Sequence, residues 1–442
     1  MATDITGFLI DLVVLLAGAV LAGELATRLG QAALVGQLIA GVVLGPTLFG
    51  PYFGLTGLSP DLSAIQFLAT VFILFLAGLE VSPEEVAGMG LPTFLAGSLI
   101  FALPFLGCAS VALLVLPGLP LETYLFLALT LSITALPVMG IMLTEFGLTG
   151  RPLGRLLMNA ALTNEIVAVA LFAILLKVYT GHTAGLLAVL EAALAVAIFL
   201  ASMLAIHMGL RSLRENRHWP RWERSIGRLW RGREGGFAIL MVLVLAATLY
   251  SQALGLTYVV GAFYAGLLIT RRSAGERTHR SLSSLFDTMT WGFFLPLFFA
   301  FAGVEMNLRL LLPLGVTVAF VALLAAGSLT KIGVGGLAAR ALGYRPPDAL
   351  AVGSLVNSRG AVELAMAVIL LGAGIFTPEQ YTLVAGVGLA TTLLAPILAQ
   401  RAWESHPETR RELYLRAPRL RPAREPAPEV PGVSEPLEGG YK

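Results

Sequence analysis

Apolar segments about twenty residues long recur along almost the whole chain, from Ile5 to Ala402, and this feature restricts the possible fold more than any other. A segment of about 20 apolar residues can cross a bilayer as a helix. The bilayer core holds no water to pair with backbone N–H and C=O groups, so each segment must satisfy them internally. Only 13% of the residues are charged, about half the usual fraction in soluble proteins. The sequence therefore predicts an all-α polytopic membrane protein.

Hydropathy and loop composition predict about thirteen transmembrane helices within a membrane domain that covers residues 1–403. The expected spans are 5–28, 31–50, 62–80, 91–117, 121–145, 152–179, 184–211, 236–253, 255–271, 284–304, 309–341, 346–373 and 378–402. The span at 309–341 is too long for one simple crossing and is expected to tilt or to extend beyond the membrane. Residues 404–442 are rich in proline, arginine and glutamate, which predicts a disordered tail.

The distribution of arginine predicts the orientation of the chain. The segment 211–234 holds eight arginines, and cytoplasmic loops are the ones that carry such an excess. With this segment inside, the N-terminus lies outside and the C-terminus lies in the cytoplasm. The expected location is the inner (plasma) membrane of the cell. The segment is interpreted as an ordinary linker or as an interfacial helix that binds anionic membrane lipid. The N-terminus lacks a basic region, which favours a retained helix over a cleaved signal peptide.

The expected topology divides the helices into two halves around the seventh helix. Helices 1–6 begin outside and helices 8–13 begin inside, which is the arrangement of an inverted repeat. The fifth helix of each half is expected to be interrupted, by SITALP near Thr134 and by GSLVNSRGAVE between Asn357 and Glu363. Broken helices at corresponding positions are the best pointer that a sequence gives to a transporter binding site.

Glu165 is the main candidate for that site because it lies in the middle of the span 152–179. An acidic residue there costs about 2.5 kcal/mol or more to insert, so a functional role is favoured over a purely structural carboxylate. A buried carboxylate holds a proton or a cation, but not readily both. Asn164, Ser132 and Thr134 offer neutral oxygens for Na⁺ or K⁺. Pro137 is expected to break its helix and to free further carbonyl oxygens.

Three further charged residues lie within expected spans. Lys331 is interpreted as a buried lysine that pairs or titrates, or as a lysine that reaches the inner membrane interface. Arg359 and Glu363 are four residues apart, which places them on one helix face. We interpret them mainly as a structural pair that neutralises charge beside the broken helix.

Other function classes find little support. The five histidines are dispersed, and no Ser-His or His-Glu-x-x-His arrangement indicates an enzyme. No cofactor or nucleic-acid partner is expected. Gly41 and Gly45 form a GxxxG pattern that favours close helix packing over a dedicated dimer contact.

Several motifs together resemble the monovalent cation/proton antiporters, the sodium/hydrogen exchanger superfamily, and within it the bacterial cation:proton antiporter-2 branch. These motifs are VGQLIAGVVLGP, ILFLAGLEV, SITALPVMGIMLTEFG, GRLLMNAALTNEIVAVAL, FLPLFFAFAGVEMNL and VGSLVNSRGAVELAMA. The resemblance implies a core of helices 4–6 and 11–13 that moves against a dimerising scaffold of helices 1–3 and 8–10. It also implies a homodimer that exchanges Na⁺ or K⁺ for H⁺ by alternating access.

The resemblance assigns ion and proton binding to adjacent acidic residues, at the positions of Asn164 and Glu165. An asparagine followed by an acid resembles the electroneutral branch, whereas Lys331 matches the lysine of the electrogenic branch. A single carboxylate exchanges one proton for one monovalent cation, which favours electroneutral exchange. Lys331 restores electrogenicity if it releases its own proton when the cation binds. A cation channel and a transport-inactive relative stay open as alternatives.

Overall fold

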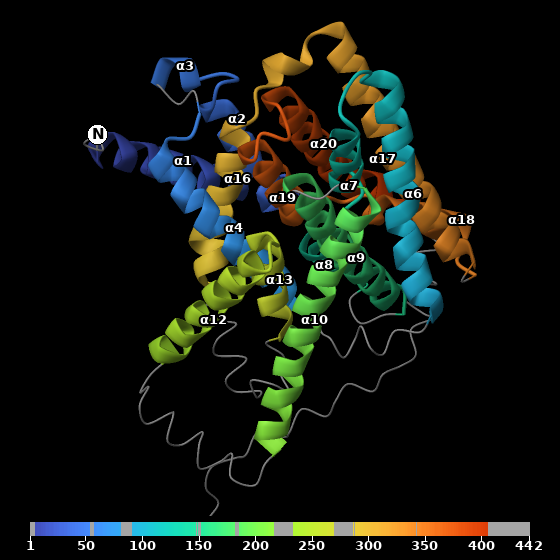
Figure 1. The fold of residues 1–442 in the computed structure, drawn as a ribbon. Helices are drawn as coiled ribbons and strands as arrows, with labels where there is room; N and C mark the ends of the chain where they lie inside the picture. Colours follow the sequence, from blue (N-terminus) through green and yellow to red (C-terminus); the bar gives the residue numbers. More distant parts are fainter. Residues whose placement is uncertain are drawn as a thin grey trace, which may run out of the picture.

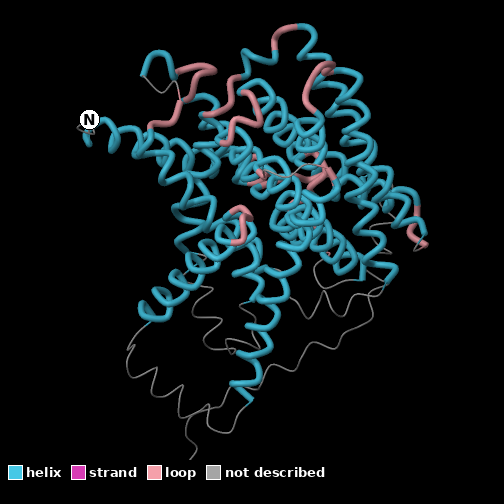
Figure 2. The backbone as a smooth tube through the Cα atoms, in the orientation of Figure 1, coloured by secondary structure: helices cyan, strands magenta, loops and turns pink. Residues whose placement is uncertain are grey.

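The computed structural model describes residues 5–53, 57–80, 91–146, 148, 152–181, 185–215, 233–268, 286, 288–341 and 343–404. Within these ranges the chain is helical and contains no strand, as Figure 2 shows. Eight of the described helical segments are long and apolar enough to cross a membrane, and one of them, Pro346–Gly372, is interrupted in its middle. The predicted all-α membrane fold is therefore confirmed. Most of the basic segment 211–234, and the tail from 405 onward, lie outside the described residues.

Figure 1 shows the described helices in chain order. They are α1 (Ile5–Arg28), α2 (Ala33–Leu44), α3 (Gly50–Phe53), α4 (Pro60–Glu80), α6 (Leu91–Val115), α7 (Leu121–Thr130), α8 (Leu136–Glu145), α9 (Pro152–Thr180), α10 (Leu186–Glu215), α12 (Arg233–Ala253), α13 (Tyr258–Leu268), η1 (Thr290–Phe294), α16 (Leu295–Val304), η2 (Leu308–Leu311), α17 (Leu314–Ala341), α18 (Pro346–Val356), α19 (Ala361–Gly372) and α20 (Pro378–Glu404).

Two of the expected spans are interrupted in their middle. The span 121–145 divides into α7 and α8, and the span 346–373 divides into α18 and α19. Figure 2 shows these interruptions as short loops inside the helical body. The first break lies before Pro137, not at it, because this proline occupies the first turn of α8. A proline there costs little, since the first N–H groups of a helix have no partner within it.

Other boundaries differ from the expected ones. Helix α17 begins at Leu314, after the short 3₁₀ helix η2. It is therefore shorter than the expected span 309–341. The expected span 284–304 contains the π-helical turn η1 before α16. Apolar composition does not distinguish these helix types, because it reports side-chain hydropathy and not which backbone groups form hydrogen bonds.

The helices pack mainly within two groups. The first, which we name the α4 group, consists of α1, α2, α4, α12, α13 and α16. The second, the α17 group, consists of α6 to α9 and α17 to α20. Helix α10 contacts a member of each group. Within the α4 group, a Cβ atom at Gly41 would lie 2.0 Å from the carbonyl oxygen of Ala300, so only glycine allows α2 and α16 to pack this closely. The interpretation of Gly41 as a packing residue is confirmed.

Candidate functional site

The two helix breaks contact each other at the centre of the α17 group. The backbone N–H of Ala135 donates to the carbonyl oxygen of Ser358 at 3.2 Å. The hydroxyl of Thr134 donates to the carbonyl oxygen of Val356 at 3.1 Å. The fold therefore brings together the two patches in which a helix break is predicted, although they are more than two hundred residues apart.

Two neighbouring side chains of α9 bind the backbone of the first break. Asn164 accepts a hydrogen bond from the N–H of Thr134 at 2.9 Å and donates one to the carbonyl oxygen of Ser132 at 3.1 Å. Glu165 accepts a hydrogen bond at Oε1 from the N–H of Leu136 at 3.0 Å. This N–H belongs to the start of α8, where backbone donors have no partner within the helix and favour a negative charge. Glu165 and Asn164 thus fix the shape of the break.

Lys331 binds the same break from α17. Its ammonium donates to the carbonyl oxygen of Ile133 and, at 2.9 Å, to the hydroxyl of Thr134. The side chain is 0% exposed. The alternative that Lys331 reaches the membrane interface is therefore wrong. A broken helix leaves carbonyl oxygens unpaired, and the lysine supplies the positive donor that such oxygens favour.

The two hydroxyl groups expected to face a cation are engaged within the protein. The hydroxyl of Ser132 donates to the carbonyl oxygen of Ala128 at 2.5 Å. The hydroxyl of Thr134 donates to Val356 and accepts from Lys331. Both residues lie at the break, as the sequence analysis predicted, but their oxygens and those of Asn164 now serve hydrogen bonds inside the site.

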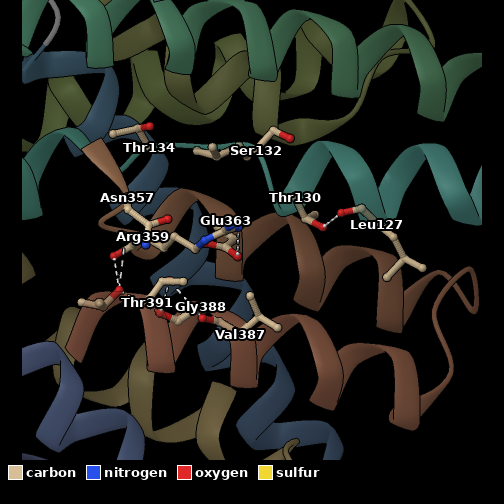
Figure 3. Close-up of polar contacts among 12 residues, drawn as sticks. Leu127, Thr130, Ser132, Thr134, Asn357, Arg359, Glu363, Val387, Gly388 and Thr391 are labelled. Carbon is tan, nitrogen blue, oxygen red and sulfur yellow. Dashed lines mark hydrogen bonds and ion pairs between the residues drawn. The ribbon is translucent and has the colours of Figure 1, made fainter. Parts of the chain in front are cut away.

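The second break carries the Arg359–Glu363 pair. Nη1 of Arg359 lies 3.2 Å from Oε1 of Glu363, and both side chains are buried. Figure 3 shows the pair between the Ser132–Thr134 segment and residues of α20. The hydroxyl of Thr392 accepts from the N–H of Arg359 at 3.2 Å and donates to its carbonyl oxygen at 2.9 Å. No pattern in the sequence marks Thr392, which is one threonine in an apolar helix.

Several buried polar atoms at the second break have no hydrogen-bond partner among the described residues. They are Oδ1 of Asn357, Oγ of Ser358, Nε and Nη2 of Arg359, and Oε2 of Glu363. Room for the pair comes from glycines: a Cβ atom at Gly327 would lie 2.7 Å from Nη2 of Arg359. The two breaks together bury two basic and two acidic side chains, so their charges balance when all four are ionised.

A small cavity reaches Glu165 between the two helix groups. Its wall on the α4 group includes Leu34, Leu76 and Phe299, together with Trp291 of the adjoining η1, and its wall on the α17 group includes Val138 and Val362. Glu165 is the one ionisable residue that lines it among the described residues. An apolar wall leaves the carboxylate as the strongest attraction in the cavity for a small cation or a proton.

The sequence matches a known family over most of its length. The model of the family described as "Sodium/hydrogen exchanger, transmembrane" matches residues 12–403. The chain is 26% identical over 413 residues to the Na(+)/H(+) antiporter NhaS4 of Synechocystis, which covers 89% of this chain and 97% of the relative. It is also 26% identical over 394 residues to the Na(+)/H(+)-K(+) antiporter GerN of Bacillus cereus, covering 88% and 94% of the two chains.

A solved structure has the same fold. The sodium proton antiporter MjNhaP1 of Methanocaldococcus jannaschii, determined at pH 8, superposes with a TM-score of 0.61 at 15% sequence identity. The superposition covers 91% of this chain and 97% of that one. At this identity the likeness bears on the fold alone. Together with the family match, it extends over the helices that hold both breaks.

Proposed function

Because the chain belongs to the sodium/hydrogen exchanger family, we propose that it exchanges Na⁺ or K⁺ for H⁺ across the membrane by alternating access at Glu165. The position of Glu165 is the observation that supports assigning the exchange site to this residue. It is a fully buried carboxylate, it lines the cavity, and it binds the first helix break.

Exchange follows from competition at one carboxylate. A cation in the apolar cavity needs a negative charge beside it, and the Glu165 carboxylate supplies one when it is ionised. A proton on Glu165 removes that charge and releases the cation. Asn164, Thr134 and Ser132 lie at the first break beside Glu165, and we propose that their oxygens join the coordination by exchanging their present hydrogen bonds. We assign Lys331 to the charge balance of the site, and Arg359 with Glu363 to the stability of the crossing.

The packing of the helices supports a division into a scaffold and a core. We propose that the α4 group is the scaffold, that it pairs with a second copy in a homodimer, and that the α17 group is the moving core. The matching breaks of α7–α8 and α18–α19 support an inverted repeat within about thirteen spans. The cavity lies on the boundary between the groups, where relative movement exposes a site to one side and then to the other.

The orientation is proposed from the charged residues that flank the helices. Arg28, Arg155, Arg340 and Arg345 share one side if every span crosses once, and Arg309 lies on the other. By the positive-inside rule the first side is cytoplasmic. The N-terminus then lies outside and the C-terminus inside, in the cell inner membrane. The cavity opens toward the cytoplasm in this arrangement, since it is lined by the beginnings of α2 and of the η1–α16 helix.

We propose that the exchange is electroneutral, because Glu165 is the only carboxylate of the Asn164–Glu165 pair. The test is exchange with the membrane potential clamped by valinomycin at several values, with Na⁺ as the transported ion. A rate independent of potential supports one proton for one cation. A steep dependence contradicts it, and Lys331→Gln then removes the dependence if the lysine carries the extra proton.

The activity itself is tested in proteoliposomes loaded with a pH-sensitive dye. Adding Na⁺, K⁺ or Li⁺ to one side of a pre-formed pH gradient is expected to dissipate it, with saturation in the cation concentration. Glu165→Gln, reconstituted in equal amount, is the matched control. A gradient unaffected by all three cations contradicts exchange. A cation flux that does not saturate and is not coupled to protons indicates a channel.

A further inference from the structure

The boundary between the two helix groups is built differently at its two ends. Around the cavity its described lining is apolar apart from Glu165. Leu295 and Phe299 of α16 line the cavity. Near the other end of the same helix, the carbonyl oxygen of Ala302 accepts a hydrogen bond from the hydroxyl of Tyr381 at 2.8 Å. Tyr381 belongs to α20, so this bond joins the α17 group to the α4 group.

A second bond lies one residue further along α20. The hydroxyl of Thr382 accepts from the N–H of Asn307 at 3.1 Å, in the segment that leads from α16 to α17. Thr47, which follows α2, binds the same segment: its hydroxyl donates to the carbonyl oxygen of Met306 at 3.2 Å and accepts from the N–H of Leu308 at 3.1 Å. The segment is therefore bound to the α4 group through Thr47 and to the α17 group through Thr382.

A third bond crosses between α9 and α12. The ammonium of Lys177 donates to the carbonyl oxygen of Leu254 at 2.8 Å, just beyond the end of α12. A helix ends with unpaired carbonyl oxygens and a partial negative charge, so a lysine is the favoured partner there. Gly255 has φ of +70°, and a Cβ atom at this position would lie 2.6 Å from Nζ of Lys177. The positive φ favours glycine at this turn, and the absence of a side chain there leaves room for the lysine.

These bonds lie on the side of the membrane opposite the cavity mouth. Helices α9, α12 and α16 end on one side, and α20 begins there, if successive spans cross in alternate directions. Lys177 follows Glu165 by twelve residues, which is about 18 Å along a helix. The carboxylate thus lies between an apolar cavity at one end of the boundary and a set of hydrogen bonds at the other.

We propose that Lys177, Tyr381 and Thr382 are positioning residues for the exchange, which hold the outer end of the boundary closed, so that the cavity at Glu165 faces the cytoplasm. This inference rests on the proposed alternating access. Opening to the outside requires the two groups to separate at this end, and the three bonds must then break. Their strength sets the ratio of inward-open to outward-open protein.

The test measures that ratio with a cysteine in the cavity. Cys108 is buried and is first replaced by alanine, and Ala77→Cys then places a single thiol in the cavity wall. The rate of its modification by a charged methanethiosulfonate is measured from each side, in right-side-out and inside-out vesicles. Lys177→Met is expected to lower the ratio of cytoplasmic to external rates about fivefold, as expected for the loss of one hydrogen bond. Tyr381→Phe and Thr382→Val are expected to shift it in the same direction.

The controls separate this role from a general loss of packing. Lys177→Arg and Thr382→Ser keep the cross-boundary bonds and are expected to restore the ratio. Thr180→Val removes a hydrogen bond at the same end of α9, to Leu176 of its own helix, and is expected to leave the ratio unchanged. If Lys177→Met does not fold, the test uses Tyr381→Phe and Thr382→Val, which change no charged residue. An unchanged ratio in the folded variants, while the parent protein exchanges cations, overturns this inference alone; a parent without exchange overturns the proposed function.

Discussion

The two helix breaks contact each other, yet they are held in different ways. At the first break, side chains from other helices bind the exposed backbone: Asn164 and Glu165 bind its N–H groups, and Lys331 binds a carbonyl oxygen. At the second break the charges bind each other, because Arg359 lies in the break itself and pairs with Glu363 in the first turn of α19. Buried atoms of both side chains are left without a partner among the described residues there.

The difference separates two tasks within one crossing. The carboxylate of the first break faces a cavity, which is the position that the proposed exchange of a proton for a cation requires. The carboxylate of the second break faces Arg359, and its charge is already neutralised. Burying such a pair contributes little net stability, but removing one partner leaves an uncompensated charge. We therefore expect substitutions at the first break to change transport and substitutions at the second to change stability.

The largest effect is expected from Glu165→Gln. The amide keeps the shape of the side chain but neither releases a proton nor balances the charge of a cation. Because the site is buried and has a low dielectric constant, losing this charge should lower the exchange rate more than about 100-fold. Dye-loaded proteoliposomes measure the rate. The matched variant is Glu363→Gln at the second break, which should retain a measurable rate. Full exchange in Glu165→Gln removes the distinction between the breaks.

Arg359→Met tests the second break. It leaves the Glu363 carboxylate buried without its partner, which should cost about 3–5 kcal/mol of stability. Thermal unfolding in detergent, followed by tryptophan fluorescence, measures the loss. The double variant Arg359→Met with Glu363→Leu removes both charges and should recover much of the stability. A double variant no more stable than Arg359→Met would show that the pair is not the source of the loss.

The sequence predicts the interrupted helices and the residues at the breaks. Charged residues and prolines are rare within the apolar spans, so those that occur there can be recognised from the sequence. It does not predict which atoms they bind. The sequence alone is compatible with a Lys331 at the membrane interface. The structure shows that α17 positions its side chain against Ile133 and Thr134 instead. Thr392 carries no signal at all, since its role depends on how α20 packs against the second break.

Lys331→Met probes the first break from the other side. It leaves two buried oxygens, of Ile133 and Thr134, without their charged donor, which should cost about 1–3 kcal/mol of stability. The exchange rate should fall as well, because the break that presents Glu165 loses its support. Unfolding temperature and exchange rate are measured on the same preparation. If stability falls while exchange is unchanged, Lys331 belongs with the structural pair and not with the site.

The smallest effect is expected away from both breaks, at Glu305, just after α16. Burial raises the pKa of the Glu305 carboxyl above its ordinary value of 4.5. The folded protein then binds this proton more tightly than the unfolded chain, so the contribution of Glu305 to stability is largest below pH 4.5 and falls as the pH rises through the raised pKa. Glu305→Gln should remove this fall. An identical pH dependence of the unfolding temperature in variant and parent would exclude Glu305 as its source.

The central claim is that cation and proton compete for one carboxylate, Glu165. The direct measurement is the initial rate of exchange as a function of Na⁺ concentration at several pH values, equal on both sides of the vesicle. Competition predicts that acidification raises the apparent KM for Na⁺, approaching about tenfold for each pH unit, while the maximal rate at saturating Na⁺ stays constant. A maximal rate that falls with acidification at constant KM would contradict a shared site.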